Sequence, residues 1–275
     1  MKIAGNVFVV TGAGNGIGRE VAKEILRRGG KVAGVDIRRS ALEETAALAH
    51  GGDRFVAFEV DITDREAVDA LPPLVMEAFG RIDGLVHVAG IIQPFVTIDE
   101  LPIEDIERVM NVNFWGTVYL DKALLPHLKQ RPEACLIAVS SMGGLVPVPG
   151  QGAYGASKAA VKLLTETLYA ELRDTNVAVT TVFPGGVATN ITENSGVTMP
   201  KMAAGAKQPK ITDPDAAGRM IVDAIERATP RLLIGSDVKS IDRISRVAPM
   251  RAITLIADKM KNLLATEDVV VREAG

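Results

Sequence analysis

Residues 7–18 read VFVVTGAGNGIG, in which an apolar run leads directly into four glycines within seven residues. The apolar run predicts a β-strand, and the residues after Gly18 have the period of a helix. Glycine lets a backbone turn tightly and approach a phosphate, and a helix N-terminus offers unpaired N–H groups and a positive dipole end. A glycine-rich turn alone can be a simple tight loop, but this one lies between a strand and a helix, as a dinucleotide-binding loop requires. We therefore expect a pyrophosphate to bind at Gly12, Asn15, Gly16, Ile17 and Gly18.

Further apolar runs alternate with segments of helical period along the rest of the chain. Such alternation is typical of a parallel sheet whose helices cover both faces, because doubly buried strands are nearly continuous in apolar residues. We predict one α/β domain over residues 1–235, a Rossmann-like, doubly wound, seven-stranded parallel sheet flanked by helices, with a flap at 190–212 and a C-terminal helical extension at 236–275. The strands are expected at 7–10, 31–36, 54–60, 82–88, 134–140, 177–183 and 231–234, and the helices at roughly 17–29, 40–49, 64–79, 104–129, 153–173 and 214–228.

Composition limits the class of function. The 275 residues are 47% hydrophobic and 24% charged, the balance of an ordinary soluble enzyme. A net charge of −3 argues against a broad basic surface for nucleic acid. Cys135 is the single cysteine, which excludes an intrachain disulfide and suits a reducing compartment. We expect a cytoplasmic enzyme without a membrane span, and the spacing of His, Cys and carboxylates predicts no metal site.

Asp36 ends the second predicted strand, eighteen residues beyond Gly18. A carboxylate at that place can accept hydrogen bonds from the adenosine ribose and would repel a 2′-phosphate, which favours NAD over NADP. Asp36 can alternatively be a helix cap or a turn residue. Arg38 and Arg39 follow closely and could hold a 2′-phosphate instead, which leaves NADP as the alternative cofactor.

Tyr154 and Lys158 are four residues apart in a segment predicted to be a helix, so their side chains share one face. A nearby ammonium favours the phenolate and lowers the pKa of the phenol, and such a pair can move a proton to or from a carbonyl or alcohol oxygen. In isolation, the same spacing often places a packed aromatic ring beside a solvated lysine. The pair therefore needs support from other motifs.

That support comes from several motifs in order along the chain. TGxxxGIG at 11–18 and YxxxK at 154–158 are accompanied by Ser141, thirteen residues before Tyr154, and by Asn113 within NVNFWG at 111–116. PGGVAT at 184–189 follows the sixth predicted strand, and Asp61-Ile62 follows the third. Over about residues 3–235 the chain resembles the short-chain dehydrogenase/reductase family. One departure is HVAG at 87–90, where the family commonly has NNAG; we expect His87 to be packed or paired locally.

The resemblance implies hydride transfer between a nicotinamide and a secondary alcohol or its ketone. Tyr154 would be the general acid/base, Lys158 would lower its pKa and bind the nicotinamide ribose, and Ser141 would polarise the substrate oxygen. Asn113 would hold a water that links Lys158 to solvent through a backbone kink. The cofactor contacts that the resemblance adds to the glycine loop and Asp36 are Asp61, Ile62, Ala89, Gly90, Tyr154, Lys158, Pro184, Gly185, Val187 and Thr189.

The substrate side is almost wholly apolar. The loop at 142–151 contains Leu145 and ends at Gln151, a candidate polar contact, and the flap adds the apolar residues Ile191, Val197, Met199 and Met202. With Ser141 and Tyr154, Leu145 and Gln151 are the predicted substrate contacts. An apolar pocket with few polar groups suits lipid-, steroid- or terpenoid-like alcohols and ketones.

The tail carries basic residues and, from Arg251 onward, an apolar stripe. Such a helix can lie on a membrane surface, but we favour packing within an oligomer or as a lid, with Pro249 dividing it from a preceding turn. The resemblance implies a homo-oligomer, a tetramer or a dimer, and Trp115 is expected in the core or at a subunit contact. The stripe consists of Ile253, Ile256, Met260, Leu263 and Leu264.

Two alternatives to the NAD-dependent enzyme stay open. The first is an NADP-dependent ketone or 3-oxoacyl reductase. The second is a non-catalytic, NAD-sensing or membrane-associated binding protein that uses the tail as its effector. The presence of all four residues Asn113, Ser141, Tyr154 and Lys158 favours an enzyme.

Overall fold

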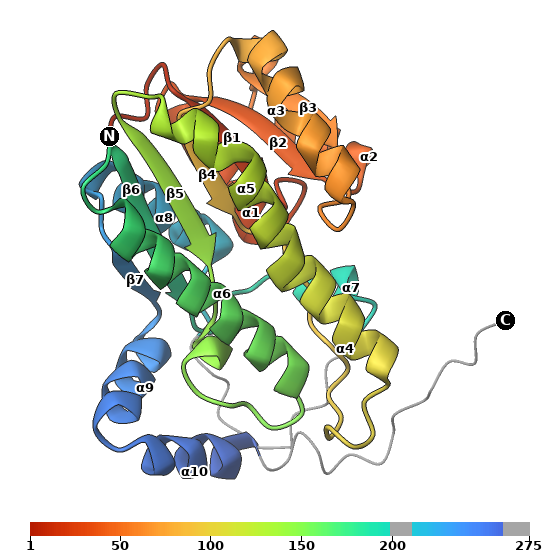
Figure 1. Ribbon diagram of the computed structural model, residues 1–275. Coiled ribbons are helices and arrows are strands. Elements are labelled where there is room, and N and C mark those ends of the chain that lie inside the picture. Colours follow the sequence, from red (N-terminus) through yellow and green to blue (C-terminus); the bar gives the residue numbers. More distant parts are fainter. Residues whose placement is uncertain (199–210, 261–275) are drawn as a thin grey trace, which may run out of the picture.

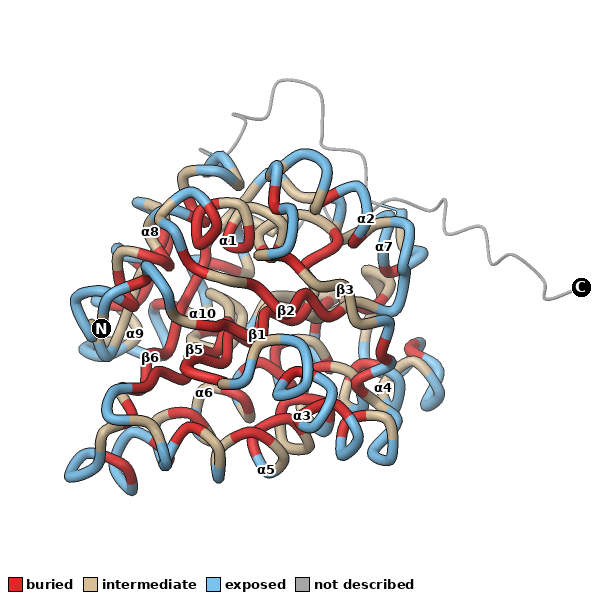
Figure 2. Tube along the Cα trace, turned by 90° about the horizontal axis from the view of Figure 1, so that it is seen from above, coloured by how far each residue is buried: buried red, intermediate tan, exposed pale blue. Residues whose placement is uncertain are grey.

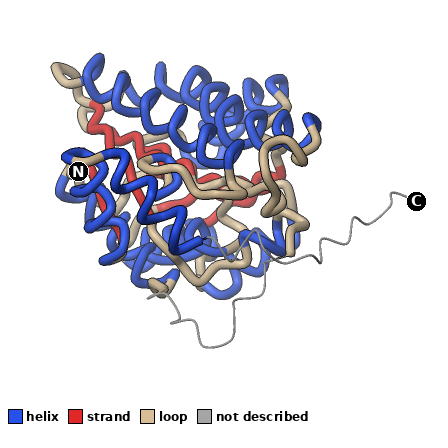
Figure 3. The backbone as a smooth tube through the Cα atoms, turned by 90° about the horizontal axis from the view of Figure 1, so that it is seen from below, coloured by secondary structure: helices blue, strands red, loops and turns tan. Residues whose placement is uncertain are grey.

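The computed structural model describes residues 1–198 and 211–260. Seven parallel strands form one sheet in the order β3-β2-β1-β4-β5-β6-β7, with helices on both faces (Figures 1 and 3), which confirms the predicted fold class. The strands are β1 (Val7–Thr11), β2 (Lys31–Asp36), β3 (Phe55–Glu59), β4 (Gly84–His87), β5 (Ala134–Val139), β6 (Val177–Pro184) and β7 (Arg231–Ile234). The helices include α1 (Gly16–Arg27), α2 (Arg39–Leu48), α3 (Arg65–Phe79), α4 (Ile103–Met110), α5 (Gly116–Lys129), α6 (Gly152–Leu172), α7 (Ile191–Asn194), α8 (Pro214–Arg227), α9 (Ser236–Val247) and α10 (Pro249–Met260).

Alternation along β1 explains why both faces of the sheet are covered. Phe8 and Val10 join one buried cluster with apolar residues of α1, α2 and α8, whereas Val7 and Val9 join a second cluster with residues of α3, α5 and α6. All four side chains are fully buried, and the buried part of the chain follows the strands through the middle of the molecule (Figure 2). A nearly continuous apolar strand is therefore required at this position.

The order of the strands places a cleft at one edge of the sheet. The chain runs outward from β1 to β2 and β3, and then returns to the other side of β1 with β4. In doubly wound sheets, ligands bind beyond the carboxyl ends of the strands where the order reverses in this way. Thr11 at the end of β1 binds the segment after β4, because its Oγ1 accepts hydrogen bonds from Val88 N (3.1 Å) and Ala89 N (3.2 Å).

The long helix predicted at 104–129 is interrupted. Between α4 and α5, residues Asn111–Trp115 form a π-helical turn, which is wider than an α-helical turn. The sequence pattern did not predict this turn, because the hydrophobic period changes little over five residues. π-Helical turns occur frequently at functional sites, and this one contains Asn113.

Two helices, α9 and α10, follow β7, and the break between them falls at Ala248 and Pro249, as the sequence predicted. Ile241 of α9 and Ile256 of α10 form a small buried cluster with Val146, which belongs to the loop after β5. The extension therefore packs on the loop predicted to line the substrate side. Leu263 and Leu264 of the predicted stripe lie outside the described residues, as do Met199 and Met202 of the flap.

Candidate functional site

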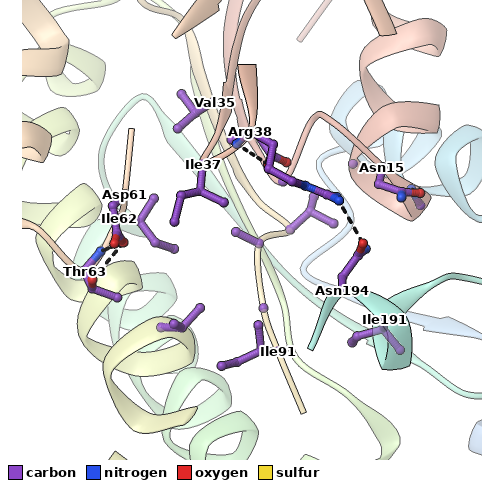
Figure 4. A pocket seen from close by; sticks show the side chains of 18 of the residues that line it. Asn15, Val35, Ile37, Arg38, Asp61, Ile62, Thr63, Ile91, Ile191 and Asn194 are labelled. Carbon is purple, nitrogen blue, oxygen red and sulfur yellow. Dashed lines mark hydrogen bonds between the residues drawn. The ribbon is translucent and has the colours of Figure 1, made fainter. Parts of the chain in front are cut away.

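A cavity of about 770 Å³ opens at the carboxyl ends of β1, β2 and β4 (Figure 4). This volume is within the range of roughly 300–1,000 Å³ that is common for small-molecule sites. The sequence did not identify several of its lining residues, which come from α4, the π-helical turn and α7, because no motif marks them. Of the predicted cofactor contacts, the structure gathers around this cavity Gly12, Asn15, Gly16, Ile17, Gly18, Asp36, Asp61, Ile62, Ala89, Gly90 and Thr189.

The glycine loop has the shape of a phosphate cradle. Gly12 has φ +66°, and a Cβ there would lie 2.9 Å from Ala89 N, so only glycine fits. A Cβ on Gly18 would overlap the carbonyl oxygen of Gly12. Asn15 caps α1, since its Oδ1 accepts from Gly16 N at 2.6 Å. The backbone of the glycine loop and of the N-terminus of α1 therefore forms part of the cavity wall. A pyrophosphate could bind there, because glycines let its oxygens come close to the backbone N–H groups.

Asp36 and Arg38 lie at the far end of the cavity from α6. The Asp36 carboxylate accepts from Gly14 N (3.1 Å) and from Arg38 N (3.1 Å), so its position is fixed by the two loops that flank it. The guanidinium of Arg38 reaches across to α7, where Nη2 donates to Asn194 Oδ1 at 3.0 Å (Figure 4). On the opposite wall, Asp61 accepts from the backbone and hydroxyl of Thr63. A carboxylate and an arginine therefore both border the end of the cavity where the sequence predicts the adenosine ribose.

Ser141 and Tyr154 lie next to each other at the end of β5 and the start of α6. Ser141 begins the short turn Met142–Gly144 and its Oγ accepts from Gly143 N at 3.1 Å. A Cβ built on Gly143 would lie 3.6 Å from both Ser141 Oγ and the ring of Tyr154, so both side chains lie beside this glycine. Burial raises the pKa of the Tyr154 phenol, and a hydrogen bond with the Ser141 side chain acts in the opposite direction.

Lys158 is one turn along α6 from Tyr154 and is only 4% exposed. Its Nζ donates to Val139 O at 3.0 Å, and burial lowers the pKa of the ammonium to about 8. A Cβ on Gly90 would lie 3.0 Å from Lys158 Nζ and 3.1 Å from Asn113 Oδ1. Because Gly90 has no side chain, Lys158 Nζ and Asn113 Oδ1 both lie close to the cavity wall at this residue.

The π-helical turn directs the Asn113 amide inward. Asn113 Oδ1 accepts from Ile91 N at 2.9 Å, and Nδ2 donates to Ile91 O (3.0 Å) and to Ser157 Oγ (2.9 Å). This amide therefore joins the segment after β4 to α6, between Tyr154 and Lys158. The water relay predicted for Asn113 stays a prediction.

The loop after β6 approaches the same region from the other side. Pro184 ends β6, and Gly185 N donates to Ile234 O at 2.8 Å, which ties the loop to β7. Val187 pairs with Thr212, and Thr189 lies close enough to Gly16 that a Cβ on that glycine would be 3.3 Å from its methyl group. Thr189 lines the cavity, whereas five other predicted cofactor contacts are not among its lining residues: Tyr154, Lys158, Pro184, Gly185 and Val187.

The structure also shows the burial or the hydrogen-bond partners of three other residues from the sequence analysis, Gln151, Leu145 and His87. Gln151 is 5% exposed, and its Nε2 donates to Gly150 O in the same loop and to Gln93 O in the segment between β4 and α4, both at 3.0 Å. Leu145, in the same loop, is partly exposed. His87 pairs with Asp121, with 2.8 Å between Nε2 and Oδ1, as its predicted local pairing required.

The core position predicted as one possibility for Trp115 is wrong. Trp115 is 45% exposed and stacks on Tyr119 of the next turn. The reason is that the π-helical turn rotates the following residues about the helix axis, and Asn113 takes the inward position instead. Gln93, which is fully buried beside Tyr154, was not identified from the sequence, because a lone glutamine in a loop carries no motif.

Within residues 1–198 and 211–260, no three His, Cys, Asp or Glu side chains gather closely enough to hold a metal ion. Among the helices that the structure describes, none is both long and apolar enough to cross a bilayer. Cys135 is buried in β5, and burial raises the pKa of its thiol to about 12.

Comparisons with known proteins agree on one family. Residues 6–199 match the sequence model of the short chain dehydrogenase family. The Mycobacterium tuberculosis protein SadH is 34% identical over 256 residues, which cover 88% of this chain and 91% of SadH. A Burkholderia phymatum short chain dehydrogenase/reductase in complex with NAD superposes with a TM-score of 0.82 and 25% identity, over 92% of this chain and 97% of that one. A Burkholderia cenocepacia short chain dehydrogenase in complex with NADP gives 0.79 and 26%, over 93% and 99%.

Proposed function

This chain belongs to the short-chain dehydrogenase family of oxidoreductases, and on that premise we propose that it moves a hydride between NAD(H) and a hydrophobic secondary alcohol or its ketone. The observation that carries the proposal is the meeting of four side chains beside the cofactor-sized cavity. Ser141 and Tyr154 are adjacent, Lys158 lies one turn further along the same helix, and Asn113 is bonded to that helix. These side chains are the ones that acid/base chemistry at a carbonyl needs.

In the proposed reaction the protein moves one proton. The Tyr154 phenol gives its proton to the oxygen of a ketone, or in the reverse direction takes one from an alcohol. The Ser141 hydroxyl donates to the same oxygen and holds it beside the phenol. A nicotinamide, when bound, supplies or accepts the hydride; the chain supplies orientation and electrostatics.

Lys158 adjusts this proton transfer. Its side chain is buried one turn along α6 from Tyr154, and a positive charge near a phenol favours the phenolate. Because burial brings the pKa of Lys158 to about 8, the lysine can exchange a proton near neutral pH. Asn113 would connect it to solvent through a water at the π-helical turn.

The apolar loop before α6 supports a hydrophobic substrate. The loop that leads into α6 borders a second cavity of about 220 Å³, which it shares with the 94–98 segment and with α10. The side chains on this wall are aliphatic or proline, so an alkyl or ring system would be bound by the hydrophobic effect. The lining consists of Val96, Ile98, Pro147, Val148, Pro149, Gly150, Gly152, Ile253 and Ala257.

Asp36 supports NAD as the cofactor, because its carboxylate borders the cavity where a 2′-phosphate would be repelled. One observation favours a second candidate, an NADP-dependent ketone or 3-oxoacyl reductase: Arg38 lines the same end of the cavity. The Burkholderia cenocepacia relative, moreover, is in complex with NADP. Calorimetric titration of the purified protein with NADH and then with NADPH decides between the two.

We also propose that the protein is a homo-oligomer. Trp115 of the π-helical turn and Tyr119 of α5 form a stacked, partly exposed aromatic pair, and exposed aromatic residues are enriched at subunit contacts. Light scattering of the wild type and of Trp115→Ser tests this; a monomeric wild type would contradict it.

Turnover tests the proposed function itself. Hydrophobic secondary alcohols incubated with the protein and NAD should produce NADH, measured by its absorbance. A protein that binds NADH but converts neither alcohols nor ketones would be a binding protein instead.

A further inference from the structure

Gln93 is fully buried in the segment between β4 and α4, and its side chain contacts the start of α6. Its Oε1 accepts a hydrogen bond from Tyr154 N at 2.9 Å, and its Nε2 donates to Gly150 O at 3.3 Å. Both ends of the amide are therefore bound to the stretch of backbone that carries Tyr154. Buried polar groups with both ends satisfied fix the geometry around them.

The first turn of α6 needs such a partner. The first N–H groups of a helix have no acceptor within the helix, and the capping residue normally supplies one. Gln151 occupies the capping position here but makes no side-chain cap. Its Nε2 instead donates to Gln93 O at 3.0 Å. Gln93 thus supplies from another segment the acceptor that the cap does not, and Gln151 in turn holds the backbone of Gln93.

The two residues before Gln93 bind other parts of the site. Ile91 exchanges two hydrogen bonds with the Asn113 amide, and Ile92 N donates to Ser195 Oγ at 3.0 Å, just after α7. Ser195 is itself 5% exposed. Three consecutive residues therefore join the π-helical turn, the segment after α7 and the first turn of α6.

We propose that Gln93 is a positioning residue, which holds Tyr154 at the distance and angle that proton transfer requires. The inference rests on the proposed function, since it assigns a role in that reaction. Tyr154 is the third residue of α6, so any shift of the first turn moves the phenol directly. A displacement of about 1 Å can lower a catalytic rate by about 100-fold.

The experiment compares three variants of the full-length protein with the wild type. Gln93→Met keeps the length of the side chain and removes both hydrogen bonds. Gln93→Glu restores them, because burial favours the neutral carboxyl, which accepts from Tyr154 N and donates to Gly150 O. Gln130→Met is the matched control, the same change at an exposed glutamine that ends α5.

Turnover, NADH affinity and amide hydrogen exchange are measured for each. Gln93→Met should lower kcat by about 10- to 100-fold while the Kd for NADH changes less than about threefold, because no Gln93 atom lines the cofactor cavity. The peptide covering 152–156 should exchange about fivefold faster, the effect of one net hydrogen bond. Gln93→Glu should recover most of the rate, and Gln130→Met should match the wild type.

Two results would overturn the inference: exchange at 152–156 that does not change in Gln93→Met, or faster exchange with unchanged kcat. A wild type that turns over no secondary alcohol or ketone would contradict the proposed function instead. In that case the exchange measurement alone decides whether Gln93 holds the turn that carries Tyr154.

Discussion

The proposed preference for NADH over NADPH depends on the carboxylate of Asp36. The substitution Asp36→Ala tests this preference. In the structure the carboxylate is already held by Gly14 N and Arg38 N, at 3.1 Å each. Its oxygens are therefore fixed at the wall of the cavity before any ligand arrives. The substitution removes the acceptors proposed for the ribose hydroxyls and also removes the negative charge that would repel a 2′-phosphate.

The magnitudes follow from these two losses. Hydrogen bonds to a charged group contribute about 1.5–3 kcal/mol, and about 1.4 kcal/mol is tenfold in affinity. Asp36→Ala should therefore raise the Kd for NADH by about 10- to 150-fold. Juxtaposed like charges cost several kcal/mol, so the Kd for NADPH should fall by at least about tenfold. Arg38 would then be the nearest cation for the 2′-phosphate.

Asp36→Asn is the matched control, because it keeps a hydrogen-bond acceptor and removes only the charge. It should bind NADPH about as well as Asp36→Ala and NADH more tightly than Asp36→Ala. Calorimetric titration with both nucleotides gives all the Kd values. If the ratio of the NADH and NADPH affinities is the same in the wild type and in both variants, the assignment of Asp36 to the ribose is wrong.

Two further predictions concern stability. His87→Ala leaves the buried Asp121 side chain without its 2.8 Å partner, so urea unfolding should show a loss of about 1–3 kcal/mol, most of it regained when Asp121→Asn is added; an unchanged free energy of unfolding would contradict a stabilising role for the pair. Burial lowers the pKa of Lys158 to about 8 from its ordinary 10.5. Between those pH values the unfolded chain keeps a proton that the folded chain has released, so this group makes the free energy of unfolding rise with pH. Relative to Lys158→Met, the wild type should gain up to about 3 kcal/mol across this range, and a constant difference would contradict the buried-lysine assignment.

The strands could be predicted because a strand that is buried on both faces of the sheet is apolar at nearly every position of its sequence. Runs such as residues 134–139 are apolar throughout, and the structure buries every one of them. Helix ends were also predictable where a cap marks them, as at Asp64, whose Oδ1 accepts from Glu66 N and Ala67 N. The hydrophobic pattern did not reveal the π-helical turn, because this turn contains no proline or glycine and leaves the pattern almost unchanged; only the family resemblance implied a backbone kink at Asn113. The core position considered for Trp115 was wrong for the same reason, whereas its alternative at a subunit contact stays a prediction.

The site was predictable where chemistry demands a fixed spacing. Glycines at 12, 16 and 18 and the tyrosine and lysine four apart form short motifs whose spacing can be read from the sequence, although the backbone and side chain that Gly12 and Gly16 approach, at Ala89 and Thr189, lie far along the chain. Gln93 and Asn194 were not predictable, since their partners lie 61 and 156 residues away in the sequence. Contacts of this kind depend on how loops cross at the sheet edge, and no local pattern encodes them.

The central claim, that Tyr154 moves the proton in a hydride-transfer reaction, is tested most directly by Tyr154→Phe. The variant keeps the ring and removes only the hydroxyl. We predict that turnover of a secondary alcohol with NAD falls by at least about 100-fold, the contribution of a general acid/base, while the Kd for NADH stays within about threefold of the wild-type value. Turnover retained at the wild-type rate would remove Tyr154 from the mechanism and contradict the account.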